Sequence, residues 1–140
     1  MVFSMTFVFF TLIMACSTES STLSELPSGT TGEFSLAIEH NDVVRTFIMY
    51  VPEVYDSSEP VPLLFNFHGY GGTSDAHMAE ADMRPVADNE NFILVYPQGT
   101  DLDGSPHWNT SEIGGDNKST ADDHGFISYL IEQIGLTYSV

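Results

Sequence analysis

The stretch "LLFNFHGYGGTSDAHM", residues 63–78, joins an apolar run to a histidine and three glycines within four residues. Residues 63–67 are apolar except for Asn66, which is typical of a strand buried on both faces of a parallel sheet. In an open parallel sheet, ligands bind beyond the carboxyl ends of the strands, where residues 68–72 are expected. Glycine tolerates positive φ and lets the backbone approach a ligand closely. The stretch therefore predicts a glycine corner, residues 68–72, at the mouth of a site.

Upstream of the corner, the sequence predicts a β-hairpin. Residues 34–39 alternate apolar and polar side chains, which is the period of a half-buried strand. Residues 43–51 are rich in β-branched and aromatic side chains, and the turn residues 40–42 separate the two runs. We expect the folded domain to begin at residue 33. The preceding segment, residues 16–32, is rich in Ser, Thr, Glu, Pro and Gly, and we predict it to be a flexible tether.

Downstream of the corner, the sequence predicts a parallel crossover. A helical region at residues 74–90 links the first apolar strand to a second apolar run at 92–97, and such units are right-handed. Pro85 cannot lie deep inside a helix, so we expect two short helices, with Pro85 in the first turn of the second. Ser74 or Asp75 is expected to cap the first of them.

A long polar loop, residues 98–121, precedes the last predicted helix. Loops of this length inside compact domains tend to carry function. Asp122 and Asp123 stand at the start of the helix, where its dipole favours negative charge, and we interpret them as capping and loop-anchoring groups. The helix is expected to stop at Gly135. The predicted fold class is therefore α/β, with a hairpin, a mostly parallel sheet and a further helix.

Two interpretations fit the glycine corner. A loop of this kind can point free backbone N–H groups into a cleft, where they stabilise the oxyanion formed when an ester carbonyl is attacked. Alternatively, the glycines only make a tight turn from strand to helix. The spacing matches neither a phosphate loop nor the dinucleotide-binding fingerprint. A metal site at His68 and His77 lacks a third ligand, so we expect no metal and no cofactor.

The composition limits the partners of the chain. Its 140 residues suit one domain, and 20 acidic residues against three basic ones give a net charge of −17. Nucleic acids and anionic membrane surfaces need positive patches, so we expect neither as a partner. We interpret the charge as an acidic surface that keeps an exported protein soluble.

The amino terminus is typical of an export signal. Residues 7–15 are apolar but too few to span a membrane. Ala15 precedes the sole cysteine, Cys16, as in a bacterial lipoprotein signal, although no Lys or Arg precedes the apolar run. We predict a signal peptide at residues 1–15 and a secreted or cell-surface lipoprotein. Membrane contact is expected only through a lipid on Cys16.

Several segments in order carry a resemblance to a known family: "RTFIMYVP", "PLLFNFHGYGG", "FILVYPQGT", "HWN" and "ADDHGFISYLI". They resemble the front half of the α/β-hydrolase family of polyhydroxybutyrate depolymerases and feruloyl or acetylxylan esterases. The resemblance covers residues 33–140. It implies a partial α/β-hydrolase fold and, for the full-length protein, hydrolysis of carboxylic esters through a Ser-His-Asp triad.

The resemblance also implies roles for the corner. In this fold, one oxyanion donor is an N–H group of the loop that follows this strand, which corresponds to Tyr70 or, alternatively, to Gly71. His68 is then structural, with its ring bonding within the turn that Gly69 and Gly72 complete. It is not the triad base, because that histidine comes last in chain order.

The resemblance also sets the expected extent of the site. Trp108, in the long loop, either forms a wall of the substrate cleft or packs under its own loop. The nucleophile motif of the family, G-x-S-x-G, occurs nowhere in the chain. The resemblance therefore implies the amino-terminal half of a secreted serine esterase, truncated before the nucleophile-elbow strand and inactive alone. The implied substrates are plant-wall feruloyl or acetyl esters or polyhydroxyalkanoate, polymeric or small, and the oligomeric state stays open.

Two other readings do not involve catalysis by this chain. One is an acidic surface lipoprotein that binds a glycan or Ca²⁺ through loop 98–121, where Asp101, Asp103 and Asp116 offer hard oxygen ligands. The other is a degenerate hydrolase fold that is used only for binding.

Lipidation of Cys16 is directly testable. After expression in a bacterium, we expect the mature chain to begin at Cys16, to carry a diacylglyceryl group and to fractionate with membranes. Mass spectrometry of the amino terminus measures this, and a Cys16→Ala variant should leave the membrane fraction. A mature terminus without lipid on Cys16 would contradict the prediction.

Overall fold

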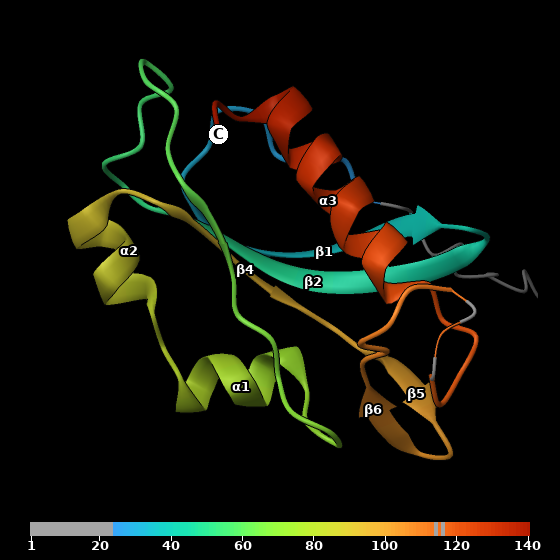
Figure 1. Ribbon diagram of the computed structural model, residues 1–140. Helices are drawn as coiled ribbons and strands as arrows, with labels where there is room; N and C mark the ends of the chain where they lie inside the picture. The colour runs from blue at the N-terminus through green and yellow to red at the C-terminus, as the bar shows by residue number, and fades with distance from the viewer. Residues whose placement is uncertain (1–23, 114, 116) are drawn as a thin grey trace, which may run out of the picture.

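The computed structural model describes residues 24–113, 115 and 117–140. Its main sheet has the strand order β1-β2-β4-β3 (Figure 1). The β1–β2 and β2–β4 pairs are antiparallel, whereas β3 and β4 are parallel. The predicted hairpin and parallel crossover are therefore confirmed. The four strands are β1 (Gly32–His40), β2 (Val43–Val51), β3 (Leu63–Phe65) and β4 (Ile93–Pro97).

The β1–β2 hairpin closes through a two-residue turn. Asn41 and Asp42 both have positive φ, 52° and 60°, and they separate the paired residues His40 and Val43. A two-residue turn with two positive φ angles matches the right-handed twist of the flanking strands, and Asn and Asp tolerate this conformation well. The turn residues thus fix the register of the hairpin.

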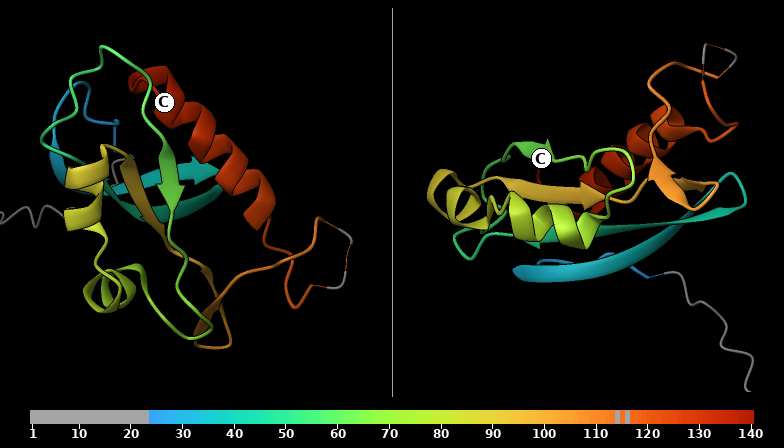
Figure 2. Two further views of the ribbon diagram at one scale, coloured as in Figure 1. Left: turned by 60° about the vertical axis from the view of Figure 1, so that its left-hand side comes forward. Right: turned by 90° about the horizontal axis from the view of Figure 1, so that it is seen from below.

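Helices cover both faces of the sheet (Figure 2). Alternate side chains of β2 point to opposite faces, as strand geometry requires. Phe47 and Met49 pack in one core cluster with Phe126 and Leu130 of the last helix, whereas Ile48 packs in the other cluster. The helices are α1 (Ser74–Glu80) and α2 (Arg84–Glu90) on one face and α3 (Asp123–Thr137) on the other.

Strand β4 lies at the centre of the core. All five of its residues are buried, with Ile93 and Val95 on the α3 face and Leu94 and Tyr96 on the opposite face. The phenol of Tyr96 donates to the Ala81 carbonyl at 2.7 Å and accepts a further hydrogen bond from a backbone N–H at 3.0 Å. The hydroxyl therefore both donates and accepts a hydrogen bond, so complete burial of this tyrosine leaves no polar group unpaired.

Three local expectations are wrong. Thr73, rather than Ser74 or Asp75, caps α1, because its side chain accepts from the Ala76 N–H. Helix α3 continues past Gly135 to Thr137 and ends where Tyr138 adopts an extended conformation. The loop 98–121 is not irregular throughout. It contains a small hairpin of β5 (Thr100–Leu102) and β6 (Ser105–His107), turned by residues 103 and 104, which both have positive φ.

The chain before β1 is described only in part. Residues 1–23, which include the predicted signal peptide, Cys16 and half of the predicted tether, lie outside the described residues. The described part of the tether packs on the domain instead of extending away from it. The Ser24 N–H donates to the Ala37 carbonyl at 3.0 Å, Leu26 packs against the core, and the Tyr138 hydroxyl bonds to the Pro27 carbonyl.

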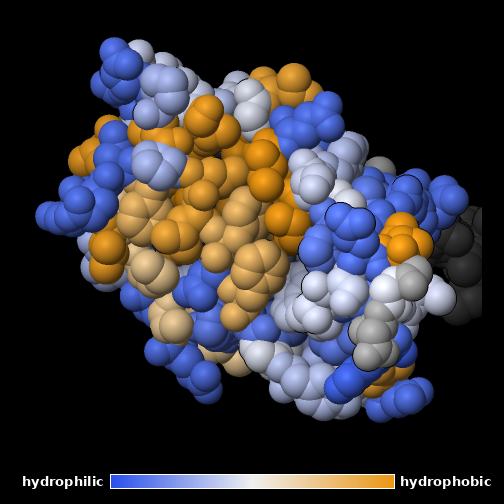
Figure 3. All heavy atoms as spheres, in the orientation of Figure 1, coloured by the Kyte–Doolittle hydropathy of each residue, from blue (hydrophilic) through white to orange (hydrophobic). Residues whose placement is uncertain are grey.

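An apolar surface flanks β3, which pairs within the described chain only with β4. Apolar side chains gather where β3 and the facing side of α3 lie (Figure 3). Phe67 is 43% exposed and Ile131 is 45% exposed. Strand edges and apolar surface of this kind favour association with another segment. Within the described residues, no helix is long and apolar enough to cross a membrane.

Helix α3 depends on an N-terminal cap. The Asp122 carboxylate accepts from the Gly125 N–H at 2.9 Å and lies 3.1 Å from His40 Nε2 on β1. The Gly125 N–H, and then the His40 ring, hold the pKa of the Asp122 carboxyl below its usual value. The interaction therefore joins the helix start to the end of the first strand.

We expect Asp122→Ala to lower the free energy of unfolding at pH 7 by about 0.5–2 kcal/mol, the usual effect of losing a cap. Because the folded-state pKa is depressed, this stabilisation is present above the unfolded-state pKa. It is lost as the pH falls through the depressed pKa of the folded state. Urea unfolding of both proteins on both sides of this pKa measures the effect. Glu132→Ala, an exposed change on the same helix, is the control. A difference between Asp122→Ala and the wild type that does not change with pH would contradict this account.

Candidate active site

The glycine corner, residues 68–72, lies between the end of β3 and the start of α1. Gly71 has a φ of +75°, a conformation that side chains disfavour. A Cβ at Gly72 would lie 3.1 Å from the Gly69 carbonyl oxygen and 3.3 Å from His68 Cβ. The backbone conformation of the corner therefore favours glycine at position 71, and a side chain at position 72 would crowd the neighbouring backbone.

His68 fixes the corner in place. The residue is 3% exposed, and its ring Nδ1 lies 2.7 Å from the Gly69 carbonyl oxygen, which can only accept. Nε2 accepts from the Gly99 N–H at 2.9 Å. These partners assign a neutral ring with the proton on Nδ1. Both ring nitrogens are thus occupied, one within the turn as expected and one across to the loop after β4.

The N–H groups of the corner differ in availability. The Gly71 N–H donates to the Pro106 carbonyl at 2.7 Å, and the Gly72 N–H donates to the Gly69 carbonyl at 3.0 Å. The Tyr70 N–H has no acceptor among the described residues. Of the two predicted oxyanion donors, Tyr70 is the one whose N–H can meet a ligand, because the Gly71 N–H is already bonded.

Trp108 packs across the corner and walls two cavities. Its Nε1 donates to the His68 carbonyl at 3.1 Å, and its ring meets Phe67 edge-on with centroids 5.1 Å apart. The corner pocket, about 370 Å³, is lined by residues 68–70, 107–110, 117 and 118. The helix pocket, about 520 Å³, is lined by Phe67, residues 108–110 and residues 123, 124, 127 and 128 of α3. Trp108 is thus a wall that the two pockets share.

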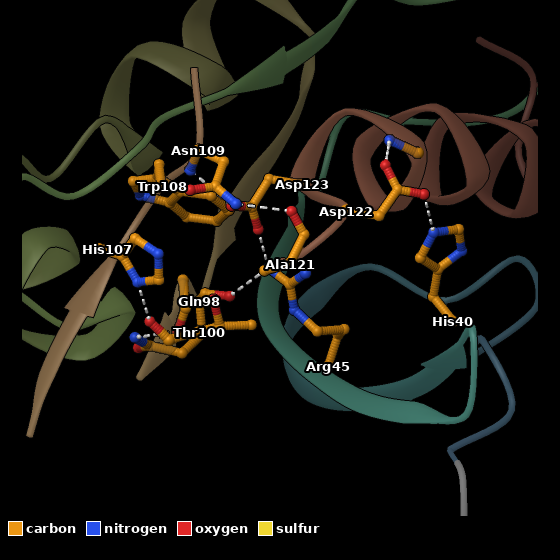
Figure 4. Close-up of polar contacts among 12 residues, drawn as sticks. His40, Arg45, Gln98, Thr100, His107, Trp108, Asn109, Ala121, Asp122 and Asp123 are labelled. Atoms are coloured by element: carbon orange, nitrogen blue, oxygen red, sulfur yellow. Dashed lines mark hydrogen bonds and ion pairs between the residues drawn. The ribbon is translucent and has the colours of Figure 1, made fainter. Parts of the chain in front are cut away.

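A buried ion pair holds this wall in place (Figure 4). The Asp123 carboxylate accepts from Arg45 Nη2 at 2.7 Å and from the Asn109 N–H at 2.7 Å. The exposed fractions of the Arg45 and Asp123 side chains are 4% and 3%. The Arg45 guanidinium lies 4.0 Å from the centre of the Phe126 ring. Asp123 therefore anchors the loop next to Trp108, as predicted from its position.

Gln98 connects the buried ion pair to the glycine corner. Its carbonyl accepts from Arg45 Nη2 at 3.2 Å, and its side-chain Oε1 accepts from the Ser74 N–H at 2.9 Å. The side-chain amide of Gln98 also lies 3.2 Å from His68 Nε2. Sequence reasoning missed Arg45 and Gln98. The available signal was a single arginine inside the apolar run "VVRTFIMYV", since a buried charge needs a partner.

The chain was compared with known protein families, curated proteins and solved structures. No family model and no curated protein matches the sequence. Solved structures do match, and one is LpqC, a poly(3-hydroxybutyrate) depolymerase from Bordetella parapertussis. Its TM-score is 0.54 at 17% identity, over 78% of this chain and 39% of that one. Two others are an S-formylglutathione hydrolase from Agrobacterium tumefaciens (TM-score 0.56, 18% identity, 86% and 48% coverage) and the fluorophosphonate-binding serine hydrolase FphF from Staphylococcus aureus (0.56, 12%, 80% and 43%).

All three are α/β-hydrolases. The chain has part of the α/β-hydrolase fold. The resemblance found in the sequence is confirmed at the level of the fold. The chain spans less than half the length of each of these structures, at 39%, 48% and 43%.

Within this α/β-hydrolase fold, one further pair has the geometry of a catalytic dyad. His107 Nε2 lies 2.8 Å from Ser119 Oγ, and His107 Nδ1 lies 2.8 Å from the Thr100 carbonyl oxygen. The Ser119 hydroxyl also accepts from the Asn109 side-chain amide at 3.1 Å and from the Ala121 N–H at 3.3 Å. The Ser119 O–H donates to His107 Nε2, and both of its lone pairs accept hydrogen bonds from the loop. No lone pair is left to attack a carbonyl, so the pair holds the loop together and is not arranged for nucleophilic attack.

The predicted ligands for a metal do not converge. His77 Nε2 lies 2.8 Å from Asn66 Oδ1, whereas both ring nitrogens of His68 bond to the backbone. Asp101 accepts from the Gly104 N–H at 2.8 Å in the small hairpin, and Asp116 lies outside the described residues. Across the part of the chain that the structure describes, no three His, Cys, Asp or Glu side chains gather as metal ligands would.

The buried ion pair is testable through Trp108, the sole tryptophan of the chain. Removing one member of a buried pair leaves an unpaired charge and typically costs about 3–5 kcal/mol. We expect Arg45→Met and Asp123→Asn each to lower the urea midpoint strongly and to shift the Trp108 emission towards that of an exposed indole.

The double variant Arg45→Met/Asp123→Asn separates pairing from simple loss of packing. Because it removes both charges, we expect its destabilisation to be well below the sum of the two single changes. Strictly additive effects on the free energy of unfolding would show that the two side chains do not act as a pair.

Proposed function

We propose that this chain is the amino-terminal part of a secreted serine esterase that hydrolyses carboxylic esters of a polymer. The single observation that carries the proposal is the Tyr70 N–H group. It has no acceptor among the described residues and belongs to a corner that lines a pocket of about 370 Å³ in an α/β-hydrolase fold. In this fold, an N–H group of the corresponding loop supports catalysis as an oxyanion donor.

The proposed chemistry is acyl transfer to a serine hydroxyl. Attack of the serine oxygen on the ester carbonyl forms a tetrahedral intermediate whose oxygen carries the negative charge. The Tyr70 amide donates to this oxygen, and the N–H following the serine supplies the second donor. His68 and Trp108 hold the corner rigidly, so that the donor needs no reorganisation during the reaction. The serine, the acid and the histidine belong, in this proposal, to the part of the protein that follows residue 140.

The substrate class follows from the walls of the site and from the structural neighbours. Tyr70, Trp108 and Phe67 offer aromatic surface beside the proposed oxyanion position. One matching structure is a poly(3-hydroxybutyrate) depolymerase. Both observations support polyhydroxyalkanoate, or plant-wall feruloyl and acetyl esters, as the polymer. We further propose export through residues 1–15, with Cys16 as the lipid anchor.

The competing proposal is an acidic surface lipoprotein that binds a glycan or Ca²⁺ through residues 98–121. The Asp101 carboxylate is engaged by the Gly104 N–H inside the small hairpin, which reduces its value as a cation ligand. The aromatic walls fit a glycan as well as an ester. Experiments must therefore distinguish an enzyme that cleaves the polymer from a hydrolase fold that only binds it.

The first test is turnover. We expect the 140-residue chain alone to leave p-nitrophenyl acetate and butyrate unhydrolysed. The intact protein should hydrolyse these esters and lose activity on treatment with a fluorophosphonate. An intact protein that binds the polymer but neither cleaves esters nor reacts with the fluorophosphonate would replace the enzyme proposal with the binding one.

The second test is on the donor. In the intact protein, we expect Tyr70→Pro, which deletes the N–H, to lower kcat by about 10²–10³ with a smaller change in KM, the usual effect of losing an oxyanion donor. Tyr70→Phe keeps the amide and is the matched comparison, so the proline variant should be at least about tenfold slower than the phenylalanine variant. Equal rates of the two variants would remove Tyr70 from the catalytic machinery.

A further inference from the structure

The three basic residues of the chain, Arg45, Arg84 and Lys118, have different surroundings. Arg45 is neutralised by Asp123 in the core. Arg84 is neutralised on the surface by Asp82 at 2.8 Å and by Glu33. Lys118 has no carboxylate within ion-pair distance among the described residues. Among the described residues, Lys118 is therefore the one basic residue that is not paired with a carboxylate.

The position of Lys118 gives this charge a role. Its ammonium nitrogen lies 5.2 Å from the centre of the Tyr70 ring, and Lys118 lines the corner pocket together with residues 68–70. A cation over an aromatic face is stabilised there by the ring quadrupole. The contact places the ammonium beside the side chain of the residue whose amide is the proposed donor.

Among the described residues, the lining of the corner pocket carries no Asp or Glu, although the chain has 20 acidic residues. A net charge of −17 repels anions at long range, but this repulsion is screened beyond about 10 Å at ordinary ionic strength. Among the described lining residues, Lys118 is the one that carries a permanent charge. A pocket of about 370 Å³ also falls within the usual size range for an organic ligand rather than a bare ion.

We propose that the corner pocket binds an ester that carries a carboxylate, with the carboxylate on Lys118 and the ester carbonyl at the Tyr70 amide. The aromatic faces of Tyr70 and Trp108 contact the carbon chain between the two groups. The inference rests on the proposed function, because it takes the corner pocket as the substrate side of the oxyanion donor. It adds a substrate class: esters with an acidic end, such as the carboxylate end of a polyester chain.

Binding without turnover tests this assignment. Monomethyl succinate and dimethyl succinate both carry a methyl ester and differ by one charge. Titration of each into the 140-residue chain at about 0.1 M ionic strength is followed by Trp108 emission, because Trp108 lines the same pocket. We expect the monoester to bind about two- to fivefold more tightly, as one partly exposed ion pair provides. Lys118→Gln should abolish the preference, and Lys118→Arg should retain it.

Two results would overturn the proposal: equal affinities of the wild-type chain for the two esters, or a preference that survives Lys118→Gln. Circular dichroism checks that the variants fold, which is expected because Lys118 is exposed. The readout uses no catalysis, so it is independent of the turnover tests above. A preference that depends on Lys118 in a protein whose intact form never hydrolyses esters would end the esterase proposal and leave an acid-binding site.

Discussion

The parallel pairing of β3 with β4 is the constraint on which the site depends. Parallel strands end at the same edge of a sheet, so the loops that follow β3 and β4 must meet there. His68, from the first loop, accepts the Gly99 N–H of the second and closes this meeting point. A Cβ at Gly99 would lie 2.3 Å from the His107 carbonyl oxygen, within the loop after β4, and 3.1 Å from His68 Cε1 of the first loop, so glycine is needed where this loop folds back on itself beside His68.

The second constraint is the burial of one arginine in an acidic chain. Arg45 enters the core on β2, and its charge requires Asp123 from the start of α3. Because Asp123 also accepts the Asn109 N–H, and the carbonyl of Gln98 accepts from Arg45, the pair ties two segments of the long loop to the sheet. The loop is thereby shaped into walls for two pockets, although much of its sequence is polar.

Much of the fold was readable from local patterns. The alternation in β1, the apolar runs of β3 and β4, the division of the helices at Pro85 and the start of α3 all depend on neighbouring residues in the chain. The errors were also local. Thr73 and Ser74 are neighbouring residues that can both cap a helix, so the sequence did not separate them. Helix α3 continues past Gly135 because Ile134 before it and Tyr138 after it both pack in the core.

The sequence by itself determined the α/β class and the glycine corner, and the resemblance that it carries implied Tyr70 or Gly71 as the oxyanion donor. Only the tertiary structure shows that the Gly71 N–H is already bonded, because its acceptor is the Pro106 carbonyl, 35 residues along the chain from Gly71. The same holds for Trp108, Arg45 and Lys118. What each can do depends on partners that lie close only after the sheet has formed, and spacing along a chain does not encode which groups meet across it.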